Sequence, residues 1–373
     1  MADGAGDRAD EDPPLDSRLP TGPLPYTDPI AEAPHEVSSE GARRFAEAGG
    51  WPGVLVRMFA RTDLSWEEAS DVLGEILQGR ASAVQLAAFL SALRTKGETA
   101  EEIAGFVAAM LANGVQVELH SPADEAVDIV GTGGDRSGTI NASTLAALVV
   151  AAAGAVVCKH GNRSSSSLAG SADVLEALGV AISLGPGGVA GCVEETGFGF
   201  CLAPRFHPAM GHAAPVRREL GVGTVFNLLG PLANPARVGR QVVGVSTPAL
   251  AATMLDALER AGSVHSMIVY GHDGLDELST VATSHVLESR CQPDGSRARR
   301  EYEIVPSDLG LRPASGRDLV GGDVRHNAER ARAILGAEPG PQREFVLLNA
   351  AAGLVVAGLV DDLSAGLSLG EQV

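Results

Sequence analysis

The feature that constrains this chain most is a short apolar segment that leads directly into a glycine-rich loop and then into a helix. The run Ala126–Val130 is typical of a buried strand, glycines stand at positions 131, 133, 134 and 138, and a helix is expected over Asn141–Ala153. Glycines let backbone N–H groups turn toward a ligand, and a helix start adds unpaired donors and a favourable dipole. The pattern predicts a phosphate or diphosphate site, although many glycine-rich turns serve packing alone.

Short apolar segments alternate with helical segments in the part of the chain that follows Pro122. Further strands are expected at residues 156–158, 198–202, 242–245 and 266–270, with an antiparallel excursion over 285–310 and helix again over 323–358. This order is typical of an α/β domain with a mainly parallel central sheet. Ligands of such sheets lie at the carboxyl ends of the strands, so the loops after the strands are expected to carry the chemistry.

The sequence before this domain divides into a tail and a helical domain. Residues 1–45 are acidic and Pro-rich, so they are predicted to be disordered, because they cannot bury enough apolar surface to offset the entropy of ordering. Residues 46–118 have helical periodicity, and residues 119–373 are assigned to the α/β domain, with helices near 215–235 expected to pack with the helical domain. Three residue pairs have capping-box spacing: Ser65 and Glu68, Ser82 and Gln85, and Thr99 and Glu102.

Composition argues against several classes of function. The formal net charge of -19 disfavours nucleic-acid binding, because contact with many phosphates needs clustered Lys and Arg. The four cysteines show no C-x-x-C spacing and are interpreted as reduced thiols. No stretch is long and apolar enough to cross a membrane, and no signal sequence opens the chain. A cytoplasmic location without a membrane partner is therefore expected.

A second polar segment, Lys159–Ser167, follows the strand expected to end at Cys158. It places two cations, an imidazole, an amide and four hydroxyls within nine residues. Hydroxyls and backbone amides can bind phosphate oxygens, and Lys159 supplies a compact positive charge. A polar serine loop would not by itself account for cations at the end of a strand in an acidic protein. The segment therefore favours an anion site shared with the glycine-rich loop.

Two further segments carry candidate chemistry. Asp276 and Glu277 follow another apolar strand, and their oxygens suit Mg2+ that is also held by substrate phosphates. Such a pair is more often a solvated loop when it stands alone. Arg217 and Arg218 could bind a carboxylate in bidentate fashion, and one of them could equally be a surface residue of a helix. His207 and His212 are candidate acid/base groups, although a structural role is commoner for either one alone.

Together these segments resemble anthranilate phosphoribosyltransferases over roughly residues 65–358. The family motifs occur in order: GTGGD with NxST, KHGNRxxSS with GSADVLEALG, HPAM through VRxxLG to FNLLGPLxNP, and DGLDE. Further matches are LSxEEA and ALRxKGET in the helical domain, and GGD and LLNAAAGL near the end. The resemblance implies a small helical domain joined to a larger α/β domain, and a homodimer that associates through the helical part.

The resemblance also implies the reaction: transfer of phosphoribose from phosphoribosyl pyrophosphate to the amine of anthranilate, releasing diphosphate, in tryptophan biosynthesis. Magnesium, two ions per site, is the implied cofactor, held by Ser143, Asp276 and Glu277. Lys159, Asp276 and Glu277 are the implied catalytic residues. Anthranilate would contact Gly131, Asn162 and Arg217, with His160 and a Gly230–Pro231 turn lining its channel. The implied substrate-binding residues are Gly131, Gly134, Asp135, Thr139, Asn141, Ala142, Ser143, Thr144, Lys159, His160, Gly161, Asn162, Arg163, Ser164, Ser165, Ser166, Ser167, Ser171 and Arg217.

The chain departs from the family pattern in several places. Arg136 stands where glycine is usual, and Ile140 and Ala142 replace the commoner Phe and Ile. The tail before Ala46 is longer than usual, and the C-terminus is shorter.

Three alternatives stay open: a phosphoribosyltransferase for another aromatic acid, a non-catalytic paralogue that binds nucleic acid, and a pyrimidine nucleoside phosphorylase.

Overall fold

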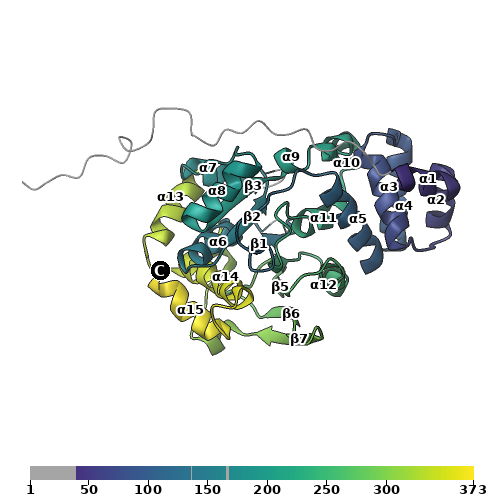
Figure 1. Ribbon diagram of the computed structural model, residues 1–373. Helices are drawn as coiled ribbons and strands as arrows, with labels where there is room; N and C mark the ends of the chain where they lie inside the picture. The colour runs from purple at the N-terminus through teal and green to yellow at the C-terminus, as the bar shows by residue number, and fades with distance from the viewer. Residues whose placement is uncertain (1–38, 136, 165–167) are drawn as a thin grey trace, which may run out of the picture.

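The computed structural model describes residues 39–135, 137–164 and 168–373 (Figure 1). Most of the predicted tail, Arg136 and Ser165–Ser167 therefore lie outside the described residues. Within the described residues no helix is long and apolar enough to span a membrane. The four cysteines are free thiols, as the sequence predicted.

From Ser39 onward, where the described residues begin, five helices form the N-terminal domain, at one end of the molecule in Figure 1. They are α1 Ser39–Glu47, α2 Gly50–Phe59, α3 Trp66–Leu77, α4 Ala83–Lys96 and α5 Ala100–Ala112. All three predicted capping boxes are present, at the starts of α3, α4 and α5. Each cap pairs two otherwise unsatisfied N–H groups, so the local sequence alone sets where these helices begin.

Helix α1 begins inside the segment predicted to be disordered up to residue 45, so that boundary was wrong by several residues. Arg44 donates from Nε and Nη2 to both carboxylate oxygens of Asp71, at 2.9 and 2.8 Å. The Phe45 ring packs edge-on against Trp51, with centroids 5.6 Å apart. Both partners lie outside α1, and the composition of the tail itself contains no sign of them.

The central sheet has seven strands in the order β3-β2-β1-β4-β5-β6-β7. The first five are parallel and the last two antiparallel, as predicted. Their bounds are β1 Val127–Gly131, β2 Val157–Gly161, β3 Phe198–Leu202, β4 Arg240–Gly244, β5 His265–Gly271, β6 Ser284–Cys291 and β7 Arg297–Ile304. From β1 the chain continues to β2 and β3 on one side of the sheet, and it then returns to the other side of β1 to form β4 and β5. The strand order therefore reverses between β1 and β4. A crevice for a ligand is expected at the carboxyl ends of these two strands.

Ten α-helices accompany the described sheet. They are α6 Ala142–Ala152, α7 Ser171–Ala177, α8 Pro186–Thr196, α9 Ala203–Phe206, α10 Ala214–Leu220, α11 Phe226–Leu232, α12 Ala251–Arg260, α13 Val324–Leu335, α14 Pro341–Ala357 and α15 Leu363–Gln372. Short 3-10 turns are η2 Pro208–His212, η3 Pro248–Leu250, η4 Pro306–Leu309 and η5 Gly316–Leu319. The predicted antiparallel excursion thus ends at Ile304 and continues as turns, and the helical stretch over 323–358 is two helices with a break at 336–340.

The two faces of the sheet have different cores. On one face α6, α14 and α15 pack against alternate strand residues such as Val242 and Met267. On the other face Val243 and Ile268 belong to the same apolar cluster as α2–α5 and α10–α12. The alternation of side chains along a strand produces this division. The helical domain therefore shares a core with the sheet, which fixes α10 and α11 beside the carboxyl ends of the strands.

Helices α3 and α5 approach closely at Gly105. A Cβ at this position would lie 2.3 Å from the carbonyl oxygen of Trp66 and 2.9 Å from the Cβ of Ala69. Gly105→Ala is therefore expected to lower the free energy of unfolding by about 1–3 kcal/mol, because the backbone of α3 must move. This loss opposes the better helix propensity of alanine, worth about 1 kcal/mol.

Chemical denaturation measures the change. Ser91→Ala on the exposed side of α4 is the control and should alter stability by less than about 0.5 kcal/mol. A Gly105→Ala variant as stable as the unsubstituted protein would contradict the prediction.

Candidate functional site

The loop after β1 and the loop after β5 pack against each other at the carboxyl edge of the sheet. The N–H of Gly133 donates to Asp276 Oδ2 at 2.7 Å. A Cβ at Gly131 would lie 2.4 Å from the same oxygen, and one at Gly244 would lie 1.5 Å from the carbonyl oxygen of Asp276. Only glycine at both strand ends allows this approach, so the strand termini themselves seat the Asp276 backbone and side chain.

Three carboxylates converge in this crevice: oxygens of Asp135, Asp276 and Glu277 lie within 4.8 Å of one another. Burial, and then the charge of Asp135, raises the pKa of Asp276 to about 6. Burial and the charges of Asp276 and Asp135 raise the pKa of Glu277 well above its usual value. Like charges held this closely fit a divalent cation with oxygen ligands, and the backbone N–H of Ser143 donates to Glu277 from the first turn of α6.

A distant segment holds the loop that leads into α6. Thr139 forms an isolated antiparallel bridge with Val320, and the N–H of Gly321 donates to the carbonyl of Gly138 at 2.8 Å. Asn327 Nδ2 donates to Asn141 Oδ1 at 3.1 Å. The late GGD motif thus supports the predicted anion-binding loop from behind, and its Asp323 caps α13.

Two predicted substrate-binding residues are buried. Ala142 is 0% exposed, and its N–H donates to the carbonyl of Ile140 at 2.7 Å. Thr144 is 1% exposed and has a buried hydroxyl without a hydrogen-bond partner among the described residues. Both lie at the start of α6, so they shape the base of the loop, while Ser143 between them is only partly buried.

Lys159 lies beneath the crevice, not at its surface. It is 2% exposed, and its ammonium donates to the carbonyl of Ile129. Burial lowers the pKa of Lys159 and raises the pKa of Asp128, while the attraction between the two charges opposes both shifts. Asn234 Nδ2 donates to Asp128 Oδ2 and to the carbonyl of Cys158, both at 2.8 Å.

Asp128 and Asn234 were not among the predicted site residues. Asp128 was interpreted only as part of a strand, and Asn234 only as part of the LANP stretch. A charged residue in an otherwise apolar buried strand was the available signal, because such a charge needs a partner.

The loop after β2 joins its predicted residues through its own hydrogen bonds. The Asn162 N–H donates to Ser171 Oγ at 3.2 Å, and the Ser171 hydroxyl lies 3.1 Å from the Asn162 carbonyl. A Cβ at Gly161 would lie 2.4 Å from the same Oγ, which explains glycine there. Ser164 donates its N–H to Asp173 at 3.1 Å. The structure therefore brings Gly161, Asn162, Ser164 and Ser171 together.

Arg163 differs from its neighbours in this loop, because its guanidinium is already paired. It donates to Asp173 at 2.8 Å and to both carboxylate oxygens of Glu176 at 2.8 and 3.0 Å. These carboxylates raise the pKa of Arg163, Glu176 contributing most. In this structure Arg163 fastens the loop to α7, so a phosphate contact by its side chain would require breaking these ion pairs.

Beside this loop lies a cavity of about 370 Å³. A neighbouring cavity at the same edge of the sheet has a volume of about 290 Å³. The larger cavity is lined by His160, Asn162, Arg217, Phe226 and Gly230, among others. Arg217 lies over the Phe226 ring, 5.1 Å from its centroid, and burial lowers its pKa. No carboxylate among the described residues forms an ion pair with Arg217. An aromatic acid matches this combination of an apolar wall and an unpaired guanidinium.

Two histidines adjoin the cavity. His160 Nδ1 lies 3.0 Å from the Gly230 carbonyl, and its buried Nε2 has no hydrogen-bond partner among the described residues. Burial, and then the proximity of His207, lowers the pKa of His160 to about 3, so the ring is neutral near pH 7. His207 Nε2 lies 2.9 Å from the Ala233 carbonyl, and its ring packs edge-on against His160. His207 therefore supports His160, whereas His212 is exposed.

Helix α11 contributes to both cavities. Phe226 and Gly230 line the larger one, and Asn227 and Leu228 line the second, of about 290 Å³, which reaches Gly133. Gly230 thus lies in a helix and not in the predicted turn. Pro231 follows within the same helix, which ends one residue later, consistent with the missing N–H of proline.

Sequence reasoning also missed the contributions of Arg94, Ser246 and Thr247 to the second cavity. Ser246 Oγ donates to the Gly133 carbonyl at 3.0 Å. Its position just after the expected strand at 242–245 was the signal, because all parallel strands end at the same edge. Arg94 comes from α4, so only the packing of the two domains reveals it.

Two family models match this chain. A glycosyl transferase family, helical bundle domain, matches residues 53–114, and a glycosyl transferase family, a/b domain, matches residues 123–373. An anthranilate phosphoribosyltransferase of Roseiflexus castenholzii is 49% identical over 319 residues, covering 85% of this chain and 92% of the relative. One of Thermomicrobium roseum is 50% identical over 316 residues, covering 85% and 90%.

Solved structures agree with these relatives. The anthranilate phosphoribosyltransferase of Thermus thermophilus has a TM-score of 0.79 at 44% identity, covering 86% of this chain and 93% of that one. The Saccharomyces cerevisiae enzyme in complex with PRPP and Mg has a TM-score of 0.73 at 27% identity, covering 90% and 93%. The same yeast enzyme with 4-fluoroanthranilate has a TM-score of 0.74 at 27% identity, covering 87% and 94%.

The buried carboxylates predict a pH-dependent cost to stability. The folded pKa of Asp276 is raised from 3.8 to about 6, so the folded state holds this proton more tightly than the unfolded state. Without divalent cations, Asp276→Asn is expected to raise the free energy of unfolding by about 1–3 kcal/mol near pH 7.5. The gain should disappear below about pH 4, where the carboxyl is protonated in both states.

Denaturation across this pH range, in the presence of a chelator, measures the effect. Asp308→Asn, at an exposed carboxylate, is the control and should change stability by less than about 0.5 kcal/mol. A destabilised Asp276→Asn protein near pH 7.5 would contradict the prediction.

Proposed function

This chain belongs to the anthranilate phosphoribosyltransferase family, and we propose that it transfers the phosphoribosyl group of phosphoribosyl pyrophosphate to the amine of anthranilate. The products are N-(5-phosphoribosyl)anthranilate and diphosphate, and the reaction is a step of tryptophan biosynthesis. The observation that carries the proposal is the half-buried Arg217, which is unpaired among the described residues and lies in an aromatic-walled cavity. The three carboxylates at the adjacent strand ends support the donor half of the reaction.

The donor diphosphate is proposed to lie on the loop from Gly131 to Asp135 and at the start of α6, where backbone N–H groups can receive it. Asp276 and Glu277, with Ser143 and Asp135 beside them, would hold Mg2+, which supplies a positive charge for the departing diphosphate. A single Mg2+ in proteins is usually held by one or two carboxylates, so three carboxylates and a diphosphate support two ions per site. The loop that follows β2, up to Ser171, would complete the donor site.

Lys159 contributes in a way that differs from the direct phosphate contact expected from the sequence. Its ammonium is buried against the Ile129 carbonyl and faces the charges of Asp128 and Glu277. We therefore propose that Lys159 offsets the negative charge beneath the crevice and keeps Glu277 ionised for the metal. Asp128, held by Asn234, fixes Lys159 in that position.

The acceptor site requires no strong base. Arg217 would bind the carboxylate of anthranilate, and the amine is already a neutral nucleophile that Asn162 and Gly131 would direct toward the ribose. In neutral His160, whose Nδ1 lies 3.0 Å from the Gly230 carbonyl, the proton is on Nδ1, which leaves the buried Nε2 as a hydrogen-bond acceptor. Displacement of diphosphate with oxocarbenium character at the anomeric carbon, and inversion there, follows from this positioning.

The direct test is an assay of purified protein with phosphoribosyl pyrophosphate, Mg2+ and anthranilate that follows the loss of anthranilate fluorescence. Turnover of salicylate or another aminobenzoate in place of anthranilate would favour the alternative of a different aromatic acid. A parallel nucleic-acid binding measurement addresses the non-catalytic alternative. Absence of turnover with all these acceptors would overturn the proposal.

We also propose a homodimer in the cytoplasm. Val56 and Phe59 on α2 and Val84 on α4 are 66, 67 and 80% exposed, which is unusual for large apolar residues and supports association through the helical domain. Light scattering tests the dimer, and a monomer at micromolar concentration would contradict it.

The free thiols are consistent with a reducing compartment, and cell fractionation tests the proposed cytoplasmic location.

The acceptor site generates a prediction with a matched control next to it. Arg217→Gln is expected to raise the KM for anthranilate about 10- to 100-fold, because a hydrogen bond to a charged group contributes about 1.5–3 kcal/mol. The KM for phosphoribosyl pyrophosphate should change little. Arg218→Gln, one residue along and exposed, should leave both values nearly unchanged. Equal effects of the two substitutions would contradict the role of Arg217.

The donor site generates another prediction. The double variant Asp276→Asn, Glu277→Gln is expected to lose about 100-fold or more in turnover, because the cation contributes several kcal/mol to stabilising the departing charge. Saturation with Mg2+ should shift to higher concentration, while thermal unfolding shows that the protein is folded. Turnover that is unchanged throughout a magnesium titration would exclude this role.

A further inference from the structure

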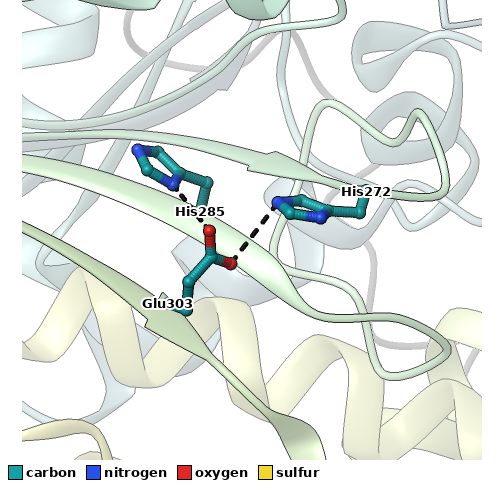
Figure 2. A group of neighbouring side chains, drawn as sticks. All are labelled: His272, His285 and Glu303. Atoms are coloured by element: carbon teal, nitrogen blue, oxygen red, sulfur yellow. Dashed lines mark hydrogen bonds and ion pairs between the residues drawn. The ribbon is translucent and has the colours of Figure 1, made fainter.

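A second cluster of potential metal ligands lies outside the residues assigned to the crevice, on the antiparallel strands β6 and β7 and at the turn that follows β5. His272, His285 and Glu303 each present a ligand atom, and these atoms lie within 4.8 Å of one another. Figure 2 shows both imidazoles directed toward the Glu303 carboxylate. The residues described as the acceptor and donor sites include none of the three.

The sheet register brings these side chains together. Tyr270 pairs with His285, and His285 pairs with Glu303, so the three residues form a row across neighbouring strands. His272 lies two residues beyond Tyr270, and its N–H donates to the Thr283 carbonyl at 2.9 Å. Because side chains alternate along a strand, residues 270 and 272 favour the same face. Backbone pairing therefore places His285 and Glu303, while one hydrogen bond to Thr283 holds His272 at the start of the loop after β5.

The distances suit a small tetrahedral ion. His285 Nδ1 lies 2.8 Å from Glu303 Oε1, and His272 Nε2 lies 3.4 Å from Glu303 Oε2. Ligands on a tetrahedral ion with bonds of about 2.0–2.1 Å are roughly 3.3 Å apart. Small side-chain movements therefore place one ion between the two imidazoles and the carboxylate, with a fourth position open to water.

The surroundings of His285 add an independent observation. Its other ring nitrogen, Nε2, lies 3.0 Å from Glu301 Oε1. A histidine that binds a metal usually donates its second N–H to a carboxylate, which fixes its tautomer and ring orientation. The Tyr270 ring also stacks on both imidazoles, at interplanar angles of 14° for His272 and 25° for His285. Both rings are thus oriented before any ion binds.

We propose that His272, His285 and Glu303 form a binding site for a transition-metal divalent cation, best matched by Zn2+. Two imidazole nitrogens and one carboxylate suit Zn2+ and its neighbours in the first transition series, whereas Mg2+ prefers oxygen ligands only. The site therefore differs in metal preference from the three carboxylates in the crevice. His272 also begins the loop that carries Asp276, so a bound ion fastens the start of that loop to β6 and β7.

The test is calorimetric titration of the metal-free protein with Zn2+ in the presence of excess Mg2+. One Zn2+ per chain is expected to bind. His285→Ala and His272→Ala should abolish this binding, and Glu301→Gln should weaken it about tenfold or more. Co2+ in place of Zn2+ should give the visible absorption of a tetrahedral site in the unsubstituted protein and in no ligand variant.

His120→Ala is the matched control, because His120 also pairs with one carboxylate, Glu194 at 3.2 Å, but belongs to no three-ligand group among the described residues. It should bind Zn2+ as the unsubstituted protein does. Magnesium-dependent turnover should persist in the His272→Ala and His285→Ala variants, which shows that they fold. Failure of the unsubstituted protein to bind Zn2+, or equal binding by both histidine variants, would overturn the proposal.

Discussion

The rest of the site depends on the close approach of the Asp276 loop to the ends of β1 and β4. Gly131 and Gly244 leave room for Asp276 to lie directly on the strand termini, and the Gly133 N–H holds its carboxylate. This approach buries one carboxylate and crowds two others against it, so the raised pKa values of Asp276 and Glu277 follow from geometry. Repulsion among the three carboxylates destabilises their charged forms when no cation is present, and a bound divalent cation would remove this repulsion.

The charge beneath the crevice is organised by a second buried group. Lys159 and Asp128 lie together on adjacent strands β2 and β1, and Asn234 donates to the Asp128 carboxylate. A buried charge without a partner would be costly, so each member of this set requires the others. In the proposal above, Lys159, predicted from the sequence to contact phosphate, instead offsets part of the negative charge of the carboxylates from beneath the crevice.

The acceptor cavity depends on the core that the two domains share. Residues of α2–α5 pack with α10–α12 and with Val243 and Ile268 of the sheet, which holds Arg217 and Phe226 at the edge of the crevice. His207 orients His160, and the Gly230 carbonyl fixes its Nδ1. The proposed donor site is thus built from loops at the strand ends, while the proposed acceptor site is built from helices that pack with the helical domain. Figure 1 shows α11 between these parts.

The sequence by itself determined the helix starts, the strand segments and the residues that gather at the strand ends. Capping boxes are local, so Ser65, Ser82 and Thr99 precede helices as predicted. Asp276 follows β5 as predicted, but β1 runs through Gly131 and β2 through Gly161, so Gly131 and Lys159 lie within strands and not after them. Only the tertiary structure decided their roles. It buried Lys159 beside Asp128 and Asn234 and paired Arg163 with Glu176. It also began the first described helix at Ser39 and brought His272, at the turn after β5, together with His285 and Glu303. The reason is physical: burial, charge pairing and strand register depend on residues far apart in the chain, which local patterns do not contain.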